Sequence, residues 1–177
     1  MPRLFVDADS MTARQRAVIL RRAGAGNIET LFVADRSLPD VAEAVRLHTI
    51  ALRAPLRGVL DRTRIRAVRS TISMVVVPTG DNSADDYIAA QCGKGDLVVS
   101  HDIPLLARVV EKGALAMDDR GNEYDEGNIR SRLGQRDVNV AFREMGLFSE
   151  RHRSMDTKVF QDFANTFDRL VSRVFSC

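Results

Sequence analysis

The chain has 177 residues, of which 45% are hydrophobic and 28% are charged, and its formal net charge is +2. This length and apolar content fit one globular domain with a full core. No apolar run approaches the roughly 20 residues needed to cross a bilayer, and the first residues resemble a strand rather than a secretory leader. Because Cys92 and Cys177 are the only cysteines, we expect a cytoplasmic protein with both thiols reduced.

Short apolar segments alternate with segments of helical spacing along the first two thirds of the chain. The apolar segments predict buried strands at Leu4–Val6, Ile28–Ala34, Ile72–Val77 and Leu97–Ser100, with a candidate fifth strand at Ala114–Met117. The helical segments are Thr12–Arg22, Pro39–Leu60 with a break at Pro55, Ser83–Cys92 and Pro104–Lys112. Ser10 or Thr12 is the expected cap of the first helix, and Ser83 that of the third.

Five other segments complete the prediction. Basic and apolar residues alternate over Arg64–Arg69, which indicates an exposed strand or ribbon, and Asp118–Tyr124 indicates a turn or hairpin. Helices follow at Asn128–Arg132, Asp137–Met145 and Asp156–Phe175. The last of them carries one apolar face, which we interpret as core rather than as a cofactor site, formed by Phe160, Phe163, Phe167, Leu170 and Val174.

Strands that alternate with helices imply a mostly parallel sheet of four to five strands, covered by helices on both faces. The expected fold class is therefore a three-layer α/β/α arrangement with a helical C-terminal region. Residues 1–150 form the α/β domain, and residues 151–177 form a helix packed on the same domain.

Acidic residues follow the ends of the predicted strands, at Asp7, Asp9, Asp81 and Asp102, and begin a helix at Asp85 and Asp86. Parallel strands bring their carboxyl ends to one edge of a sheet, so we expect these side chains to converge. Crowded carboxylates repel each other unless a hard cation neutralises them, and Mg²⁺ and Mn²⁺ take oxygen ligands. The pattern favours a divalent-metal site used for phosphodiester hydrolysis.

Helix capping is the alternative explanation for each acid taken alone. Asp7 is a better ligand candidate than Asp9, because alternate residues of an extended segment point to opposite sides. Asp85 is preferred over Asp86, because Ile88 and Ala89 turn the face of Asp85 toward the sheet.

Seven arginines lie between Arg46 and Arg69, opposed by Asp61 alone. A basic stretch beside an acidic pocket suits a polyanion held by its phosphates, so we expect RNA contacts from Arg62, Arg64 and Arg66. The alternative is an ordinary solvated face in a chain that uses arginine as its usual cation.

Several stretches together resemble a known family. The most specific are Val6-Asp7-Ala8-Asp9, Gly80-Asp81 with Ala84-Asp85-Asp86-Tyr87-Ile88, and Gly95 to Leu105 with its Ser100-His101-Asp102. They resemble the YaiI/YqxD family of uncharacterised bacterial proteins, within the PIN-like nuclease superfamily. The resemblance implies a PIN-like α/β/α fold and, by analogy with active PIN domains, acidic residues that hold Mg²⁺ or Mn²⁺ for RNA cleavage. Two departures stand out: Ser10-Met11-Thr12 replaces the usual Ala-Cys-Pro, and the segment between Arg36 and Ser70 is long.

The leading hypothesis is a metal-dependent ribonuclease. Ser100 would position a phosphate or the attacking water, and His101 is expected to face solvent, with proton transfer as its alternative role. The metal ligands would be Asp7, Asp81, Asp85 and Asp102, with Asp9 as a further candidate.

Two other functions remain open. One is a non-catalytic RNA-binding or regulatory protein that keeps the scaffold. The other is a HAD-type phosphohydrolase, disfavoured because that chemistry needs a cation between its two acidic motifs and no lysine precedes Lys94.

Overall fold

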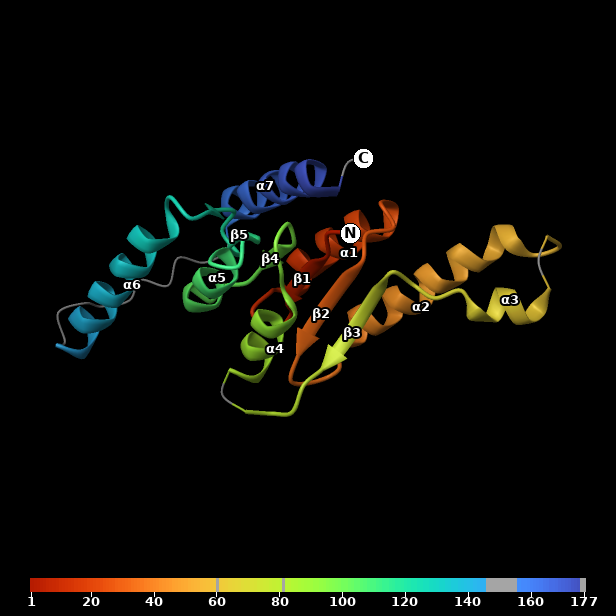
Figure 1. Cartoon of the computed structure of the whole chain (residues 1–177), viewed down its shortest axis with the longest axis horizontal. Coiled ribbons are helices and arrows are strands. Elements are labelled where there is room, and N and C mark those ends of the chain that lie inside the picture. The colour runs from red at the N-terminus through yellow and green to blue at the C-terminus, as the bar shows by residue number, and fades with distance from the viewer. Residues whose placement is uncertain (60, 81, 146–155, 176–177) are drawn as a thin grey trace.

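A computed structural model of the chain describes residues 1–59, 61–80, 82–145 and 156–175. Within these residues lies one six-stranded sheet in the order β3-β2-β1-β4-β5-β6 (Figure 1). The neighbouring pairs from β3 to β5 are parallel, and β6 pairs antiparallel with β5. The strands are β1 (Leu4–Asp7), β2 (Thr30–Ala34), β3 (Ile72–Val76), β4 (Leu97–Val99), β5 (Leu115–Met117) and β6 (Glu123–Tyr124).

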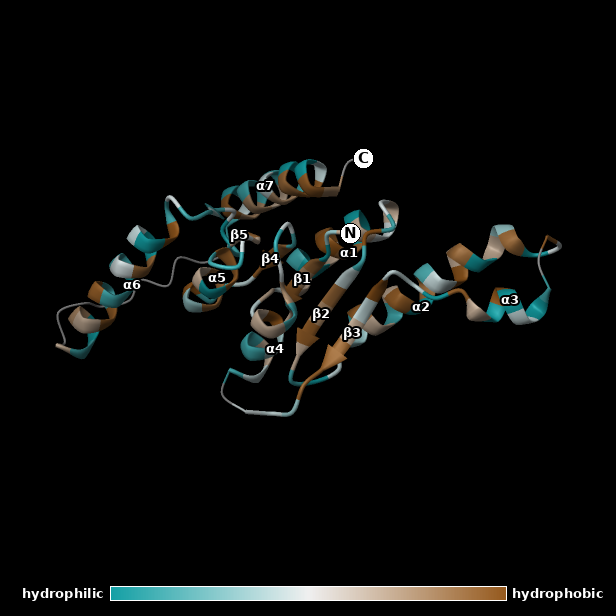
Figure 2. Cartoon of the chain, viewed as in Figure 1, coloured by the Kyte–Doolittle hydropathy of each residue, from teal (hydrophilic) through white to brown (hydrophobic). Residues whose placement is uncertain are grey.

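Helices cover both faces of the sheet, which gives the expected three-layer α/β/α fold. They are α1 (Ala13–Ala25), α2 (Pro39–Arg53), α3 (Arg62–Ala67), α4 (Ser83–Gln91), α5 (Ile103–Val110), α6 (Ile129–Glu144) and α7 (Thr157–Phe175), with a 3₁₀ turn η1 (Ala54–Leu56) after α2. Figure 2 shows mostly hydrophobic strands between helices that carry both hydrophobic and hydrophilic residues. None of the helices in the described residues combines the length and apolarity needed to cross a bilayer.

The alternation of side chains along β1 divides the core into two halves. Leu4 and Val6 belong to the half that α1, α2 and α7 cover, whereas Phe5 belongs to the half beneath α4 and α5. On the α7 side, Phe163 and Phe167 are fully buried. The apolar stripe predicted for the last helix is therefore core, although the boundary expected near residue 150 lies outside the described residues.

Capping residues fix where the helices near the carboxyl edge begin. Thr12 and Gln15 form a reciprocal capping box at α1, which selects Thr12 over Ser10 as the cap. The side chain of Asp102 accepts a hydrogen bond from the amide of Leu105 and so caps α5. Ser83 does not cap α4, because the residue before the helix is Asn82 in a left-handed conformation, with φ 61°.

Two other predictions of secondary structure were wrong. Arg64–Arg69, expected as a strand or ribbon, lies mostly in helix α3, because Asp61 accepts hydrogen bonds from the amides of Thr63 and Arg64 and starts a helical turn there. The segments Asn128–Arg132 and Asp137–Met145 belong to the single helix α6, which continues through Gly134. One glycine lowers helix stability without ending the helix.

The sheet also differs in two details from the prediction. The hairpin at Asp118–Tyr124 adds β6, so the sheet has six strands rather than four or five. β3 forms the opposite edge of the sheet, and of its residues only Ile72 is buried, so it is not the buried strand expected. An edge strand has a neighbour on one side only, which leaves more of it in contact with solvent.

Candidate acidic site and adjoining cleft

Asp7 is the buried acid of the predicted set. It ends β1 and is only 6% exposed, and Ser100 Oγ donates a hydrogen bond of 2.7 Å to its Oδ2. Burial raises the pKa of Asp7, while the hydrogen bonds from Ser100 and Ser10 oppose that change and the charge of Asp9 adds to it. A carboxylate in such a place is more stable once a cation compensates its lost hydration.

Ser100 joins Asp7 to Asp102. Its hydroxyl donates to Asp7 and accepts the backbone N–H of Asp102 at 2.9 Å. The residue is fully buried, so it has no exposed atom to offer a phosphate or a water, contrary to the sequence-based role. It instead fixes the position of the loop that follows β4 relative to the end of β1.

Asp85 lies in the first turn of α4 and faces the other two acids. Its pKa is raised to about 6, first by burial and then by the charges of Asp7 and Asp102, whereas Arg108 lowers it. Asp86 points elsewhere and forms an exposed ion pair of 2.9 Å with Arg108. The structure therefore brings Asp7, Asp85 and Asp102 to one carboxyl edge, from β1, α4 and the loop after β4.

Asp9 does not join this group. Asp9 accepts the amide of Asp35 at 2.9 Å and pairs with Arg36 at 3.1 Å, which ties the loop after β1 to the loop after β2. Asp81 lies outside the described residues. As the side chains are placed, no group of three His, Cys, Asp or Glu residues in the described ranges could hold a metal ion.

The donor chemistry of the three acids nevertheless fits a hard cation. All their ligand atoms are carboxylate oxygens, which suit Mg²⁺ and Mn²⁺. Asp7 and Asp102 both destabilise the ionised form of Asp85, and Arg108, which favours it, is already engaged with Asp86. A divalent ion at this edge would relieve the repulsion that the chain leaves only partly compensated.

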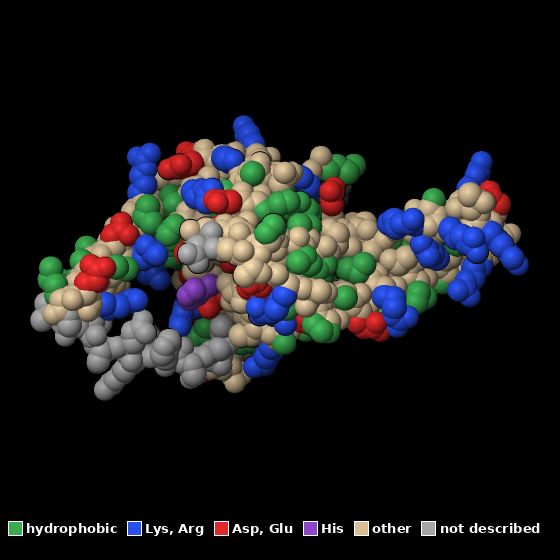
Figure 3. Space-filling model, turned by 90° about the horizontal axis from the view of Figure 1, so that it is seen from below, with side chains coloured by type: hydrophobic (Ala, Val, Ile, Leu, Met, Phe, Trp, Pro, Cys, Tyr) green, Lys and Arg blue, Asp and Glu red, His purple; other side chains and the backbone are tan. Residues whose placement is uncertain are grey.

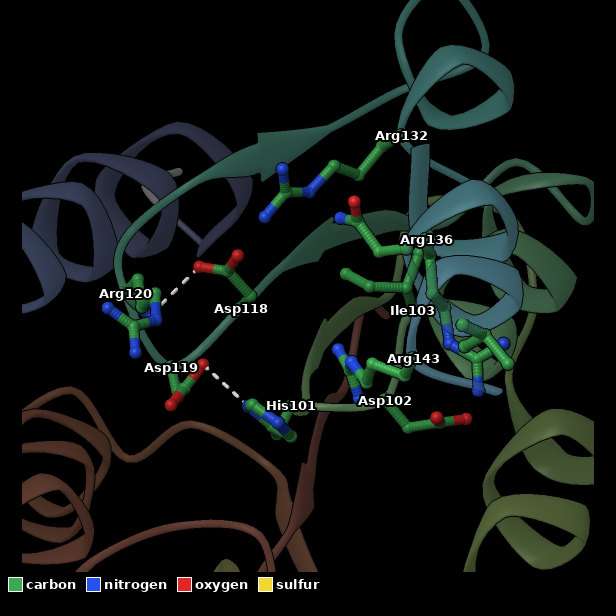
Figure 4. Close-up of a pocket in the computed structure, with 11 residues that line it drawn as sticks. His101, Asp102, Ile103, Asp118, Asp119, Arg120, Arg132, Arg136 and Arg143 are labelled. Atoms are coloured by element: carbon green, nitrogen blue, oxygen red, sulfur yellow. Dashed lines mark hydrogen bonds and ion pairs between the residues drawn. The ribbon is translucent and has the colours of Figure 1, made fainter. Parts of the chain in front are cut away.

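A cleft of about 420 Å³ opens beside Asp102 (Figure 4). One side consists of the segments after β4 and β5, and the other side is α6. The lining residues are His101, Asp102, Ile103, Asp118, Asp119, Arg120, Arg132, Arg136, Asn139, Val140 and Arg143.

Two acids of this cleft, Asp118 and Asp119, have partners in the segments that follow β4 and β5. Asp118 is buried and accepts hydrogen bonds from the Tyr124 hydroxyl, the Asn122 side chain and two backbone amides. Asp119 contacts His101 Nδ1 at 3.0 Å, and this hydrogen bond raises the pKa of His101. The His101 side chain is 66% exposed, in agreement with the expectation that it faces solvent.

The arginines of α6 form the functional feature that the sequence analysis missed. Arg132, Arg136 and Arg143 fall within an arc of about 40° on a helix, so they share one face, which is the face toward the cleft. The helical spacing of these arginines could have indicated a shared face. The prediction of two separate helices, Asn128–Arg132 and Asp137–Met145, left this spacing unnoticed.

The predicted RNA-binding arginines lie elsewhere. Arg62, Arg64 and Arg66 belong to α3, which precedes β3 and is therefore on the side of its amino end. The acids lie at the carboxyl ends of the parallel strands, which is the opposite end of the strands from α3. Figure 1 shows α3 at the far end of α2, away from α6, and Figure 3 shows basic side chains gathered on this projecting end. The basic stretch is thus not beside the acidic pocket.

Ser10 and Met11, which depart from the family pattern, both have structural roles. Ser10 Oγ donates to the carbonyl of Asp7 at 2.9 Å and accepts the amide of His101 at 3.1 Å. Met11 is buried in the core beneath α1. Ser10 therefore makes a second link between the loops that carry Asp7 and Asp102.

Comparison with known proteins gives consistent matches over most of the chain. A family model described as "Uncharacterized BCR, YaiI/YqxD family" matches residues 53–173. A UPF0178 protein of Pseudomonas putida strain GB-1 is 30% identical over 172 residues, covering 97% of each chain. Another, from Shewanella piezotolerans, is 34% identical over 171 residues, covering 97% of this chain and 95% of its own. A third, from Trichlorobacter lovleyi, is 39% identical over 134 residues, covering 76% and 87%. No solved structure matches significantly.

Proposed function

Because the chain belongs to the YaiI/YqxD family, a group described as uncharacterized, we propose a function from its own acidic site: metal-dependent hydrolysis of RNA phosphodiester bonds. The observation that carries this proposal is the electrostatic coupling of Asp85 to Asp7 and Asp102. Three segments that are distant in sequence bring carboxylates together at the carboxyl edge of a parallel sheet, where ligands of open α/β folds usually bind.

The proposed ligands of Mg²⁺ or Mn²⁺ are Asp7, Asp85 and Asp102, with Asp81 as a further candidate. A bound ion would activate water and stabilise the leaving oxygen. Ser100 keeps Asp7 and the Asp102 loop in register through two hydrogen bonds, and Ser10 adds a second connection between the same loops. These hydroxyls act through the carboxylates that they position.

A cytoplasmic setting is part of the proposal. Burial raises the pKa of Cys92 to about 11, so this thiol stays protonated and unreactive near neutral pH. A reduced, inert cysteine is what a protein of the reducing cytoplasm is expected to carry.

The matched pair Asp85 and Asp86 gives a direct test. Asp85→Asn should abolish Mn²⁺-dependent cleavage of single-stranded RNA and the Mn²⁺-induced rise in melting temperature. Asp86→Asn should keep both, because Asp86 is exposed and paired with Arg108. Cleavage and thermal melts, each with Mn²⁺ and with EDTA, provide the two measurements. Equal activity of both variants would refute the site.

A non-catalytic RNA-binding protein is the second candidate. It is favoured by the basic face of α6, which offers phosphate contacts that need no metal. A wild-type protein that binds RNA but shows neither cleavage nor a metal-induced shift would support this function over hydrolysis.

A further inference from the structure

We define the α6 wall as Arg132, Arg136, Asn139 and Arg143, the polar residues of α6 that line the cleft. Residues four apart on a helix have Cβ atoms about 6 Å apart, a spacing comparable with that of successive phosphates along a nucleic-acid strand. Arg132 and Arg136 have this separation, and both are exposed. The wall therefore presents guanidinium groups in a row along the cleft.

The two acids on the other side of the cleft have other partners and, among the described residues, do not pair with Arg132 or Arg136. Asp118 accepts hydrogen bonds from its own hairpin, and Asp119 pairs with His101. Arg132 contacts Gln135 and Arg136 contacts Asp137, each at the long distance of 3.5 Å and each on α6 itself. Arg132 also interacts with the Tyr124 hydroxyl and opposes the rise in its pKa that burial causes. Such contacts between exposed neighbours are weak and are readily exchanged for a phosphate.

The end of the cleft that holds Asp102 leads to the acidic site. Asp102 belongs both to the cleft lining and to the group that raises the pKa of Asp85. A strand lying along the α6 wall would therefore bring one of its phosphodiesters to the proposed metal ligands. In the view of Figure 4, Asp102 is drawn beside Arg143 and farther from Arg132.

From this geometry we infer that the α6 wall binds the sugar–phosphate backbone of a single RNA strand and places it across the acidic site. Cleavage of that strand depends on the proposed function, whereas its binding does not. The volume of the cleft, about 420 Å³, favours a single strand, because it is of the size that holds a small ligand rather than a duplex. Among its described lining residues there is no Phe, Tyr or Trp, so we infer that binding reads phosphates rather than bases.

The test is metal-free binding of a fluorescent, single-stranded RNA oligonucleotide, measured by anisotropy in EDTA over a series of salt concentrations. The variant is Arg132→Gln with Arg136→Gln. The control is Arg130→Gln, which removes one positive charge from the same helix at a position about 160° around it from Arg132. We expect the double variant to bind about tenfold more weakly for each arginine replaced, with a salt slope smaller by about 1.4. The control should bind like the wild type.

Equal losses in the double variant and the control, or no binding by the wild type, would overturn the inference. A duplex of the same sequence that binds as tightly as the single strand would also overturn it. Arginine-dependent binding in a protein that never cleaves would leave the α6 wall standing and refute the ribonuclease. Mn²⁺-dependent cleavage that is unaffected in the double variant would refute RNA binding by the α6 wall and leave the ribonuclease proposal standing.

Discussion

Arginines gather in two regions of this protein, the projecting end formed by α2, η1 and α3 and the α6 wall of the cleft (Figures 1 and 3). The first region is much the more conspicuous in the sequence, with seven arginines between Arg46 and Arg69. The second lies beside Asp102, at the edge where the acidic site forms. The density of arginines along the chain pointed to the projecting end. The α6 wall became apparent only from its position relative to the sheet.

Several arginines of the projecting end are occupied within it. Arg53 donates to the carbonyls of Val68 and Arg66, and so connects the end of α2 to the end of α3. Arg69 also donates to the Arg66 carbonyl, and Arg46 pairs with Glu43 at 2.6 Å. These contacts show that part of the arginine run closes a helical hairpin. A run of like charge is therefore a weaker indicator of a binding face than its count suggests.

The largest effect on activity should come from replacing the acids of the acidic site, which the projecting end lacks. Asp7→Asn and Asp102→Asn should fold, because an asparagine oxygen can still accept the Ser100 hydroxyl or cap α5. Metal-free melting should rise slightly as repulsion is relieved, while cleavage and the Mn²⁺-induced shift disappear. Thermal melts and cleavage assays on the same preparations measure this. Folded variants that keep both properties would exclude the site.

Glycine substitutions compare the rigidity of the two regions. Gly121 has φ +86°, and a Cβ there would lie 2.7 Å from the backbone of Asp162 in α7. Gly58, in the projecting end, has the same φ but no atom within 4 Å. We expect Gly121→Ala to lower the free energy of unfolding by about 2–4 kcal/mol and Gly58→Ala by about 1–2 kcal/mol, because only the first adds a backbone clash to the strain. Urea denaturation provides the values, and equal losses would contradict close packing of the hairpin on α7.

Removal of charge from α3 sharpens the comparison of the two arginine regions. Arg62→Ala, Arg64→Ala and Arg66→Ala combined should weaken RNA binding and flatten its salt dependence by about 0.7 for each phosphate that the protein no longer neutralises. The rate of cleavage at saturating RNA should not change, because α3 lies at the opposite edge from the acids. Anisotropy titrations at several salt concentrations, with Arg130→Ala as control, test this. An unchanged slope would make α3 an ordinary solvated surface.

The smallest expected effect is a dependence of stability on pH. The pKa of Asp85 is raised from 3.8 to about 6 in the folded protein. Between these values the native state binds more protons than the unfolded state, so metal-free stability should fall as pH rises from about 4 to about 6. Asp85→Asn should flatten that decline, whereas Asp86→Asn should not. Melting temperatures in EDTA across this range measure the difference, and parallel curves for wild type and Asp85→Asn would contradict the raised pKa.

Much of the fold and part of the site could be predicted from local patterns. The strands β1, β2, β4 and β5 and the helices α1, α4, α5 and α7 lie within a few residues of their predicted positions. The choice of Asp85 over Asp86 also followed from helical geometry, since Ile88 and Ala89 are buried on the side toward the sheet. The failure at α3 has a local cause too, because the cap at Asp61 outweighs six residues of basic and apolar alternation.

The sequence by itself determined the alternation of strands and helices, because hydrophobic periodicity and capping residues act over a few neighbouring positions. It also placed acids at strand ends, which fixed the edge at which they meet. Only the tertiary structure decided that Ser100 is buried between Asp7 and Asp102, that Asp9 turns to Arg36, and that α6 rather than α3 borders the acids. These outcomes depend on contacts between segments that are far apart in the chain, and no local pattern encodes such a contact.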